Sequence, residues 1–246
     1  MILGLIPSRI GSSRLKKKPL LKIDGYPIIV HTFKRAMLSK KLDQVIVCTD
    51  HKEIVDVVEK NNGKAILTSK KHKNGSERIY EVAKKLKPKL VVDIQGDEPL
   101  VNPNDIDRVI EFHKKNMHFD IVVPSMIIKK DINSDSRNLI KVVFSKRGKI
   151  IYFSRAKVPF DYNNKNIKYF KDLSIVSFKP NALKKYCEVK IGEIEKKEGI
   201  ELIRALENDI SMGTFVIKGS SFSVDAKQDL MRAINVMPRD PIRKRY

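Results

Sequence analysis

The chain has 246 residues, of which 41% are hydrophobic, enough for one large α/β domain or two small ones with a substantial core. Fifty Lys and Arg residues against 29 Asp and Glu residues give a formal net charge of +21 at pH 7, which indicates an anionic partner: a nucleotide, a nucleic acid, an acidic sugar or a membrane surface. Because Trp is absent and aromatic residues are only 7%, the base-stacking surface of a single-strand nucleic-acid binder is disfavoured.

The patterns of cysteine, histidine and apolar residues exclude several other classes. Cys48 and Cys187 are far apart, which is typical of reduced thiols in a cytosolic protein. The five histidines have no metal-ligand spacing with each other or with cysteine, so we do not expect a zinc site. No apolar run approaches about 18 residues and no signal-peptide pattern opens the chain. We therefore expect a cytoplasmic protein without membrane insertion.

A basic loop near the start carries the first functional signal. The apolar residues 1–6 predict a buried strand that stops at Pro7. The loop after it combines small residues with five positive charges: Ser8, Gly11, Ser12 and Ser13 with Arg9, Arg14, Lys16, Lys17 and Lys18. Backbone amides and guanidinium groups between a strand and a helix bind phosphate oxygens, so we interpret the segment as a nucleotide loop. The alternative is a solvated basic surface loop.

Other phosphate-binding motifs are absent from the chain. No G-x-x-x-x-G-K-[ST] sequence occurs, and no G-x-G-x-x-G sequence opens a helix. A P-loop NTPase or a dinucleotide-binding Rossmann enzyme is therefore disfavoured.

Strands and helices alternate through the first half of the chain. The expected strands are 44–49, 65–68, 90–94 and 119–123, and the expected helices are 27–38, one around 54–58 that Thr49-Asp50 caps, one from 76, and 104–113. This alternation with short links is typical of a parallel sheet with helices on both faces.

The pattern changes after residue 138. Strands are expected at 138–144, 148–153 and 173–178, with a hairpin turn at SKRG, and indicate antiparallel additions to the main sheet. The remaining expected elements are a helix at 194–208, strands at 214–218 and 222–224, a helix at 227–236 and an exposed, mobile tail, PRDPIRKRY.

Two aspartates follow predicted strands. Asp97 comes just after the strand 90–94, and Asp225 comes just after 222–224. Open α/β sheets bind ligands at such strand ends, and Mg²⁺ takes one or two carboxylates together with water and phosphate oxygens. The alternative is that each aspartate caps the next turn or helix.

Three polar groups provide further candidates. Gln95-Gly96 could hydrogen-bond a base or sugar edge, or form only a tight turn. His72, Ser76 and Arg78 lie near a helix start, which suits an anion or ordinary capping. Arg155 could meet a carboxylate, or lie at the surface of a hairpin.

In order and spacing, seven motifs make the chain resemble the 3-deoxy-manno-octulosonate (Kdo) cytidylyltransferases from residue 1 to about 237. They are IPSRIGSSRLKKKPL, VIVCTDHKEI, HKNGSERI, VVDIQGDEPLV, NLIKVVFSKRGKIIYFSRAKVP, ELIRALEN and SVDAKQDL. The resemblance implies a single α/β domain, 1–246, with a GT-A-like, Rossmann-like nucleotidyltransferase fold. Its mixed, mainly parallel sheet would be flanked by helices, and residues 138–190 would include an antiparallel arm for dimerisation and sugar binding.

The resemblance also implies a reaction. The anomeric hydroxyl of a sugar acid attacks the α-phosphate of CTP, which gives a CMP-sugar for lipopolysaccharide or capsule and releases pyrophosphate, with Mg²⁺ as cofactor and a homodimer as the assembly. It assigns catalysis to Arg9, Lys18 and Asp97, and metal binding to Asp97 and Asp225. The implied nucleotide contacts are Ser8, Arg9, Gly11, Ser12, Arg14, Lys18, His72, Ser76, Arg78 and Gln95, and the implied sugar contacts are Gln95, Arg155, Glu195 and Glu198, with Glu201 on the same acidic segment.

The chain departs from the family pattern at several positions. Lys17 replaces a glycine before the lysine of the loop, and VDAKQDL replaces VDTPEDL. Asp172, Ser174 and Val176 replace the His-x-Gly-x-Tyr pattern of the sugar pocket. Activation of another nonulosonate or of a modified Kdo is therefore an alternative. A nucleic-acid-binding protein and a catalytically inactive relative are more distant ones.

Overall fold

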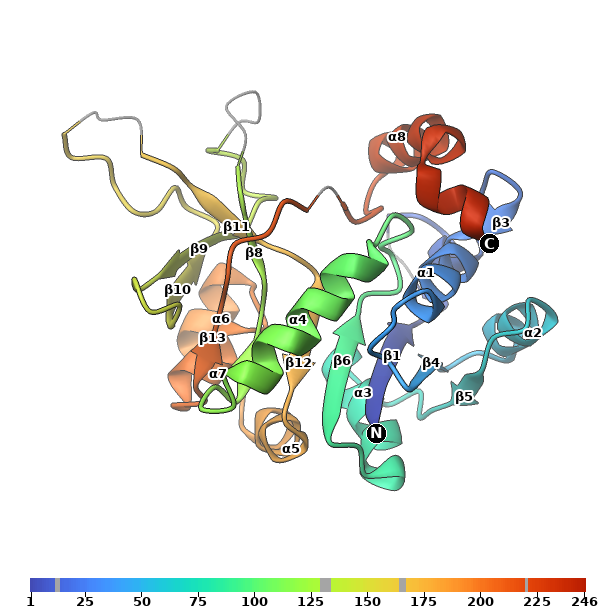
Figure 1. The fold of residues 1–246 in the computed structure, drawn as a ribbon, viewed down its shortest axis with the longest axis horizontal. Coiled ribbons are helices and arrows are strands. Elements are labelled where there is room, and N and C mark those ends of the chain that lie inside the picture. The colour runs from blue at the N-terminus through green and yellow to red at the C-terminus, as the bar shows by residue number, and fades with distance from the viewer. Residues whose placement is uncertain (12–13, 129–133, 164–166, 220) are drawn as a thin grey trace.

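The computed structural model describes residues 1–11, 14–128, 134–163, 167–219 and 221–246. Within these residues, a mixed seven-stranded sheet lies between helices, and a four-stranded antiparallel sheet adjoins it (Figure 1). A short hairpin of β2 (Lys22–Ile23) and β3 (Tyr26–Pro27) follows the basic loop and a 3₁₀ turn at Lys18–Leu20.

The main sheet is mostly parallel, as predicted. Its order is β13 (Met212–Gly213), β7 (Ile121–Val122), β12 (Ile175–Phe178), β6 (Leu90–Ile94), β1 (Ile2–Ser8), β4 (Gln44–Thr49) and β5 (Ala65–Leu67). β1 is parallel to β4 and β6, whereas β12 is antiparallel to β6 and β7. The chain moves from β1 to one side of the sheet and returns on the other with β6, so the strand order reverses at β1 and β6.

Each face of the sheet is covered by its own helices. α1 (Ile28–Met37), α2 (Lys52–Lys60) and α4 (Pro103–Lys115) pack on one face, and α3 (Gly75–Leu86), α5 (Pro180–Glu188) and α7 (Ile203–Glu207) pack on the other. Along β6, Val92 packs in the core under α1, α2 and α4, and Val91 packs in the core under α3, α5 and α7. Since both faces are buried, the central strands are continuous apolar runs, and the predicted bounds of β4 and β6 are confirmed.

The second sheet contains the predicted hairpin. Its order is β10 (Ile150–Ser154), β9 (Lys141–Phe144), β11 (Phe170–Asp172) and β8 (Ser125–Ile127), with every pairing antiparallel. The strand predicted at 173–178 is β12, which begins at Ile175 and lies antiparallel in the main sheet, whereas β11, just before it in this second sheet, was not predicted. The half-buried Phe-Lys-Asp of β11 and the fully buried β12 lie in different environments, so the chain links the two sheets here.

The predicted helix at 194–208 is two helices. α6 (Glu193–Glu198) ends at Gly199, whose φ is +61°, and α7 begins at Ile203. A left-handed glycine stops a helix after its last turn, which the apolar periodicity of this segment does not reveal. The strands predicted at 214–218 and 222–224 are also wrong: β13 ends at Gly213, and only Val216 forms an isolated bridge, to Ser125.

The C-terminal segment packs against α1, contrary to the expectation of a mobile tail. After α8 (Lys227–Val236), two 3₁₀ turns bring Tyr246 to the buried side of α1. Its hydroxyl lies 2.7 Å from His31 Nδ1 and accepts a hydrogen bond from Arg35 Nε at 3.2 Å. Asp240 forms an ion pair of 2.8 Å with the same arginine. No helix within the described ranges is long and apolar enough to cross a membrane.

Candidate active site

A cleft opens where the strand order reverses. It is lined by the segments that follow β1 and β6, by the start of α3, and by Glu201 and Asp225. Gly96 lets the first two segments meet, because a Cβ at this position would lie only 2.6 Å from the carbonyl oxygen of Pro7. The parallel register of β1 and β6 therefore brings the basic loop beside Asp97.

Lys18, Asp97 and Asp225 form one cluster in this cleft, called here the carboxylate corner. Lys18 Nζ lies 2.6 Å from Asp97 Oδ2 and 3.1 Å from Asp225 Oδ1, and its side chain is 16% exposed. Arg14 reaches the same oxygen of Asp225 at 3.1 Å. Burial alone would lower the pKa of Lys18, but the two carboxylates outweigh it and the pKa is raised, so the ammonium stays charged.

The donor set of the carboxylate corner fits magnesium bound together with phosphate. Both carboxylates bond the same ammonium nitrogen, so their oxygens lie close enough to face one shared ion. No group of three or more His, Cys, Asp or Glu side chains that could hold a metal occurs within the described ranges. Two carboxylates are what Mg²⁺ uses when phosphate oxygens and water complete its shell.

The basic loop lines the cleft through Ser8, Arg9, Gly11, Arg14 and Lys18. Ser8 is buried, and Arg9 and Arg14 are exposed to solvent. The sixth predicted phosphate contact of this loop, Ser12, lies outside the described residues.

Lys17 shows why the family favours glycine at this position. Its φ is 51°, in the left-handed region that glycine enters without a steric cost. The side chain does not line the cleft, and its ammonium pairs with Glu53 of α2 at 2.7 Å. The departure from the family pattern therefore affects the backbone of the loop and leaves the cleft lining unchanged.

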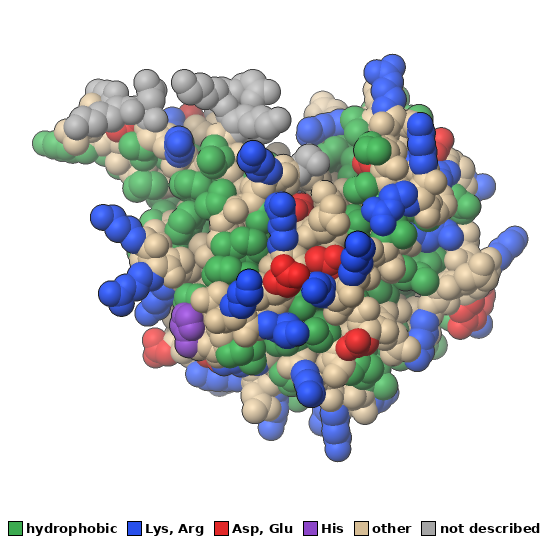
Figure 2. Space-filling model, viewed as in Figure 1, with side chains coloured by type: hydrophobic (Ala, Val, Ile, Leu, Met, Phe, Trp, Pro, Cys, Tyr) green, Lys and Arg blue, Asp and Glu red, His purple; other side chains and the backbone are tan. Residues whose placement is uncertain are grey.

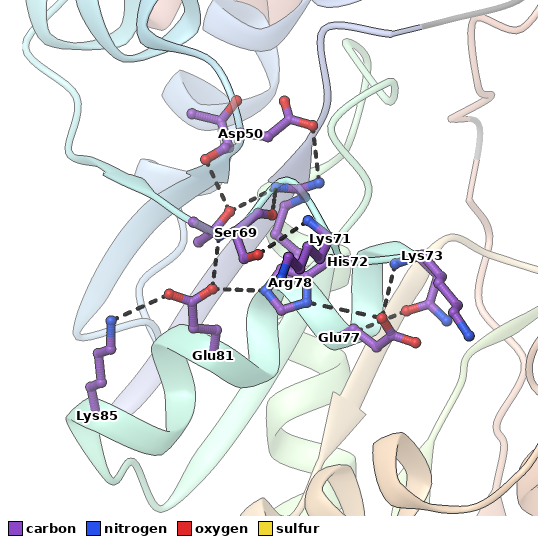
Figure 3. A network of polar contacts seen from close by, with 12 residues as sticks. Asp50, Ser69, Lys71, His72, Lys73, Glu77, Arg78, Glu81 and Lys85 are labelled. Atoms are coloured by element: carbon purple, nitrogen blue, oxygen red, sulfur yellow. Dashed lines mark hydrogen bonds and ion pairs between the residues drawn. The ribbon is translucent and has the colours of Figure 1, made fainter.

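Arg78 connects α3 to Asp50, which follows β4 (Figure 3). The buried guanidinium donates to Thr68 Oγ1 at 2.7 Å and to Asp50 Oδ2 at 3.1 Å. The other oxygen of Asp50 accepts from the backbone of Ile10 at 3.3 Å. The prediction that Thr49-Asp50 caps α2 is therefore wrong: the N-cap of α2 is His51. Arg78 also lines the cleft, and its contact with the nucleotide or sugar stays a prediction.

His72 lies in the same network and also lines the cleft. Its Nε2 is 2.7 Å from Glu81 Oε2, which the backbone of Ser69 also reaches at 3.0 Å (Figure 3). The amide of Ser69 and the imidazole lower the pKa of Glu81 to about 2. Ser76 is buried in the first turn of α3 and does not line the cleft.

Gln95 lines the cleft with its amide held in one orientation. Its Nε2 donates to both carboxylate oxygens of Asp93 at 3.0 Å, which leaves the amide carbonyl as the acceptor for a ligand. Asp93 is buried, and burial, with the charge of Glu201 adding to it, raises its pKa well above the ordinary value. Asp93 was not predicted, although a carboxylate inside the apolar run Leu-Val-Val-Asp-Ile is a usable signal.

The other predicted sugar contacts lie outside the cleft lining. Arg155 donates from Nε to the carbonyl of Glu198 at 2.7 Å and from Nη2 to that of Gly199 at 3.0 Å. The carboxylate of Glu198 accepts from Ser154 Oγ at 2.7 Å, and Glu195 forms a buried bidentate pair with Arg204 at 2.6 and 2.8 Å. These contacts join α6 to β10 and to α7. The sugar-binding role of these residues stays a prediction, whereas Glu201 does line the cleft.

The three replaced pocket positions differ in environment. Val176 is buried in the core, and the Ser174 side chain hydrogen-bonds Glu98. Asp172 is half-buried at the end of β11, and burial raises its pKa to about 6.

Comparison with known proteins identifies the family. A family model described as "Cytidylyltransferase" matches residues 3–212. The chain is 37% identical to the 3-deoxy-manno-octulosonate cytidylyltransferase of Thermodesulfovibrio yellowstonii, with 92% of this chain and 94% of the relative aligned. It is 33% identical to the 8-amino-3,8-dideoxy-manno-octulosonate cytidylyltransferase of Shewanella putrefaciens, over 93% of this chain and 95% of that one.

Solved structures agree with this family. CMP:2-keto-3-deoxy-manno-octonic acid synthetase complexed with CTP superimposes with a TM-score of 0.93 at 29% identity and covers 97% of this chain and 98% of its own. A putative glucose-1-phosphate thymidylyltransferase from Bacillus anthracis, with a TM-score of 0.67 at 16% identity and coverage of 96% of this chain and 95% of its own, shares the fold. The chain is therefore a nucleotidyltransferase of the 3-deoxy-manno-octulosonate cytidylyltransferase family.

Proposed function

We propose that the protein transfers CMP from CTP to the anomeric hydroxyl of Kdo, or of a closely related sugar acid, and releases pyrophosphate. The product would serve lipopolysaccharide or capsule synthesis in the cytoplasm. The main observation that supports the proposal is the carboxylate corner. There Lys18 bonds Asp97 and Asp225 beside the basic loop, where the strand order of the sheet reverses. Relatives that cover nearly the whole chain support this choice of substrates.

Charge neutralisation is the main contribution of the chain in this scheme. Arg9 and Arg14 would bind the triphosphate oxygens at the mouth of the cleft, together with Ser8, Gly11 and Ser12. Lys18, which its two carboxylate neighbours keep charged, would face the α-phosphate. In-line phosphoryl transfer depends on such positioning and on groups that balance charge as it develops.

Asp97 and Asp225 would hold Mg²⁺. When bound, the ion supplies a Lewis acid that withdraws charge from the phosphate oxygens. The protein's own contribution is to hold both carboxylates on the ammonium of Lys18, so that they would offer a bound cation a preformed pair of oxygen donors.

The sugar acid would lie on the side of Gln95 and Glu201. The amide carbonyl of Gln95, which Asp93 orients, can accept a hydrogen bond from a sugar hydroxyl. His72 and Arg78 would lie on the cytidine or sugar side, and Arg155, Glu195 and Glu198 would reach the sugar only if α6 and β10 move toward the cleft.

We also propose a homodimer formed through the arm, residues 138–190. On the second sheet, Ile127 is 40% exposed and Ile151 is 57% exposed, and Phe160 in the following segment is 83% exposed. Large apolar side chains of this kind favour burial against a second copy of the chain. Sedimentation equilibrium should give the mass of a dimer, and Ile151→Glu should shift the protein toward the monomer.

A modified, amino-substituted Kdo is the second candidate substrate. Asp172 stands where the family pattern has a histidine, and a relative from Shewanella putrefaciens carries the name of an 8-amino-3,8-dideoxy substrate. At pH 7.5, with a pKa of about 6, the Asp172 carboxylate is mostly charged and suits an ammonium group.

A nucleic-acid partner is disfavoured, because Lys and Arg side chains are spread over the visible face rather than gathered in one patch (Figure 2).

Pyrophosphate release tests the proposal. Purified protein with Mg²⁺ and CTP receives Kdo, 8-amino-3,8-dideoxy-Kdo or another nonulosonate in separate reactions. Release of pyrophosphate with Kdo supports the leading proposal. Release with the amino sugar alone would identify that sugar as the substrate of the same CMP-transfer reaction. No release with any of these sugars, from folded protein that binds CTP, would contradict the assigned reaction.

A further inference from the structure

Glu98 is a buried acidic residue that the proposed reaction does not use. It follows Asp97 directly, is 3% exposed, and is not among the residues that line the cleft. Its carboxylate accepts hydrogen bonds from Ser223 Oγ at 2.8 Å, from Ser221 Oγ, and from the side chain of Ser174. A buried carboxylate is costly unless it is fully hydrogen-bonded, and three hydroxyl donors supply that compensation.

Two of these donors belong to the segment that delivers Asp225. Residues 221–225 have no helix or strand assignment, so no sheet ladder sets their register against β6. The bonds that Glu98 accepts, together with one backbone bond from Val224 N to the carbonyl of Asp97 at 2.9 Å, connect this segment to the end of β6. A slip of one residue would move Asp225 away from Lys18.

The segment is anchored on its other side by α8. Asp229 Oδ2 accepts from the backbone of Asp225 at 3.1 Å and of Ala226 at 2.8 Å, in the geometry of a helix cap. Asp225 therefore lies between two anchors: Asp229 connects it to α8, whereas the bonds to Glu98, together with the backbone bond from Val224 to Asp97, connect it to the end of β6. The distance between the two carboxylates of the corner depends on the second anchor.

We propose that Glu98 is a positioning residue that sets Asp225 against Asp97 and thereby determines the affinity of the carboxylate corner for a divalent cation. The metal part rests on the proposed function, whereas the positioning part does not need a metal. A carboxylate is required because both of its oxygens accept from hydroxyls on the same segment. The isosteric Gln would present one amide NH₂ to a hydroxyl and lose one acceptor.

The first measurement concerns position alone. Hydrogen exchange of residues 221–225 is followed in the metal-free protein for wild type and Glu98→Gln. We expect exchange at the Val224 amide to be at least about tenfold faster in the variant, because the loss of bonds to a charged acceptor loosens the segment. Unchanged exchange at this amide would overturn the proposal.

The second measurement concerns the cation. Mn²⁺ binding in the presence of CTP and absence of sugar is titrated by electron paramagnetic resonance. Outer-shell partners of metal ligands typically contribute about 10–100-fold to affinity, so Glu98→Gln should weaken Mn²⁺ binding by a factor in that range. Equal Mn²⁺ affinity of variant and wild type would contradict the proposal. If wild type binds no Mn²⁺, the proposed metal site fails, while the exchange measurement still decides the positioning role.

Two further variants complete the design. Ser223→Ala removes one hydroxyl donor and keeps Glu98. It should therefore speed exchange at the Val224 amide and weaken Mn²⁺ binding, each by a smaller factor than Glu98→Gln does. If Glu98→Gln does not fold, Ser223→Ala takes its place in both measurements. Glu111→Gln makes the same chemical change on an exposed face of α4, where the glutamate pairs only with Lys41 at 3.1 Å among its described contacts, and should leave both readouts at the wild-type value. A Glu111→Gln effect as large as that of Glu98→Gln would overturn the specific role.

Discussion

At the residue scale, the cleft depends on side chains whose partners hold them in one position. Lys18 is fixed by Asp97 and Asp225, and Gln95 is fixed by Asp93. In each case the partner decides which atoms of the side chain face the ligand. Preorganisation of this kind lowers the cost of ordering the site when CTP binds.

Gly96 gives a prediction at the same scale. In Gly96→Ala the new methyl group would meet the Pro7 carbonyl, a backbone atom that cannot rotate away, so the two cleft segments must separate. We expect the free energy of unfolding to fall by about 1–3 kcal/mol and turnover to fall with it. Gly11→Ala is the matched stability control, because among the described residues no atom beyond its chain neighbours lies within 4 Å of its added Cβ. Denaturant titration of both variants checks the difference, and equal stability would contradict the close approach.

The sequence revealed these residues unequally. Arg9, Lys18 and Asp97 were expected at the cleft and line it, because charge and the end of β6 are visible in the order of residues, and Asp225 lines it although the strand predicted before it does not form. Asp93 and Glu98 were not found, because their importance lies in hydrogen bonds to residues such as Gln95 and Ser223 rather than in any local pattern.

At the element scale, β4 and β6 were predicted within their bounds, whereas β1 was predicted to stop at Pro7 and continues to Ser8, and the irregular segments were not predicted. β4 and β6 are apolar runs between polar links, which is sufficient for a strand prediction. The segment 194–208 has helical periodicity throughout, and only the backbone conformation of Gly199 divides it. At 221–225 the side chains alternate as in a strand, but their partner is Glu98 and not a neighbouring strand.

The C-terminal segment was predicted to be an exposed tail because of its basic composition, but it packs on α1. Tyr246 is held by His31 and Arg35, both of which are buried in α1. Tyr246→Phe would leave these two groups without their hydroxyl partner, and we expect a loss of about 1–3 kcal/mol in the free energy of unfolding. Thermal and denaturant unfolding measure it. The control Tyr162→Phe, at a position 86% exposed, should leave stability unchanged, and a wild-type stability for Tyr246→Phe would mean that the tail does not pack on α1.

At the scale of the whole molecule, acid should destabilise the fold through two buried histidines. Burial, the dominant effect at each, lowers the pKa of His31 and of His113 to about 4. The unfolded chain takes up these protons near pH 6.5, so their contribution to stability is complete above that pH and is lost as the pH falls toward 4. Between pH 7 and pH 5 we expect a loss of about 2 kcal/mol for each histidine.

The double variant His31→Gln/His113→Gln isolates this effect from the other titrating groups. Urea unfolding at a series of pH values should show a shallower fall in stability from pH 7 to pH 5 for the variant than for wild type. Parallel curves for the two proteins would show that these histidines titrate normally in the folded state.

Turnover of Asp97→Asn tests most directly whether the carboxylate corner carries out CMP transfer. This variant keeps the size of the side chain and removes the charge that faces both Lys18 and the proposed metal. With CTP, Mg²⁺ and the sugar acid that wild type uses, we predict that kcat falls about 100-fold or more while the melting temperature stays near that of wild type. The control Asp56→Asn, whose carboxylate lies on the exposed face of α2 and pairs with Lys52 at 2.6 Å, should turn over at the wild-type rate. Wild-type turnover by Asp97→Asn would contradict the account.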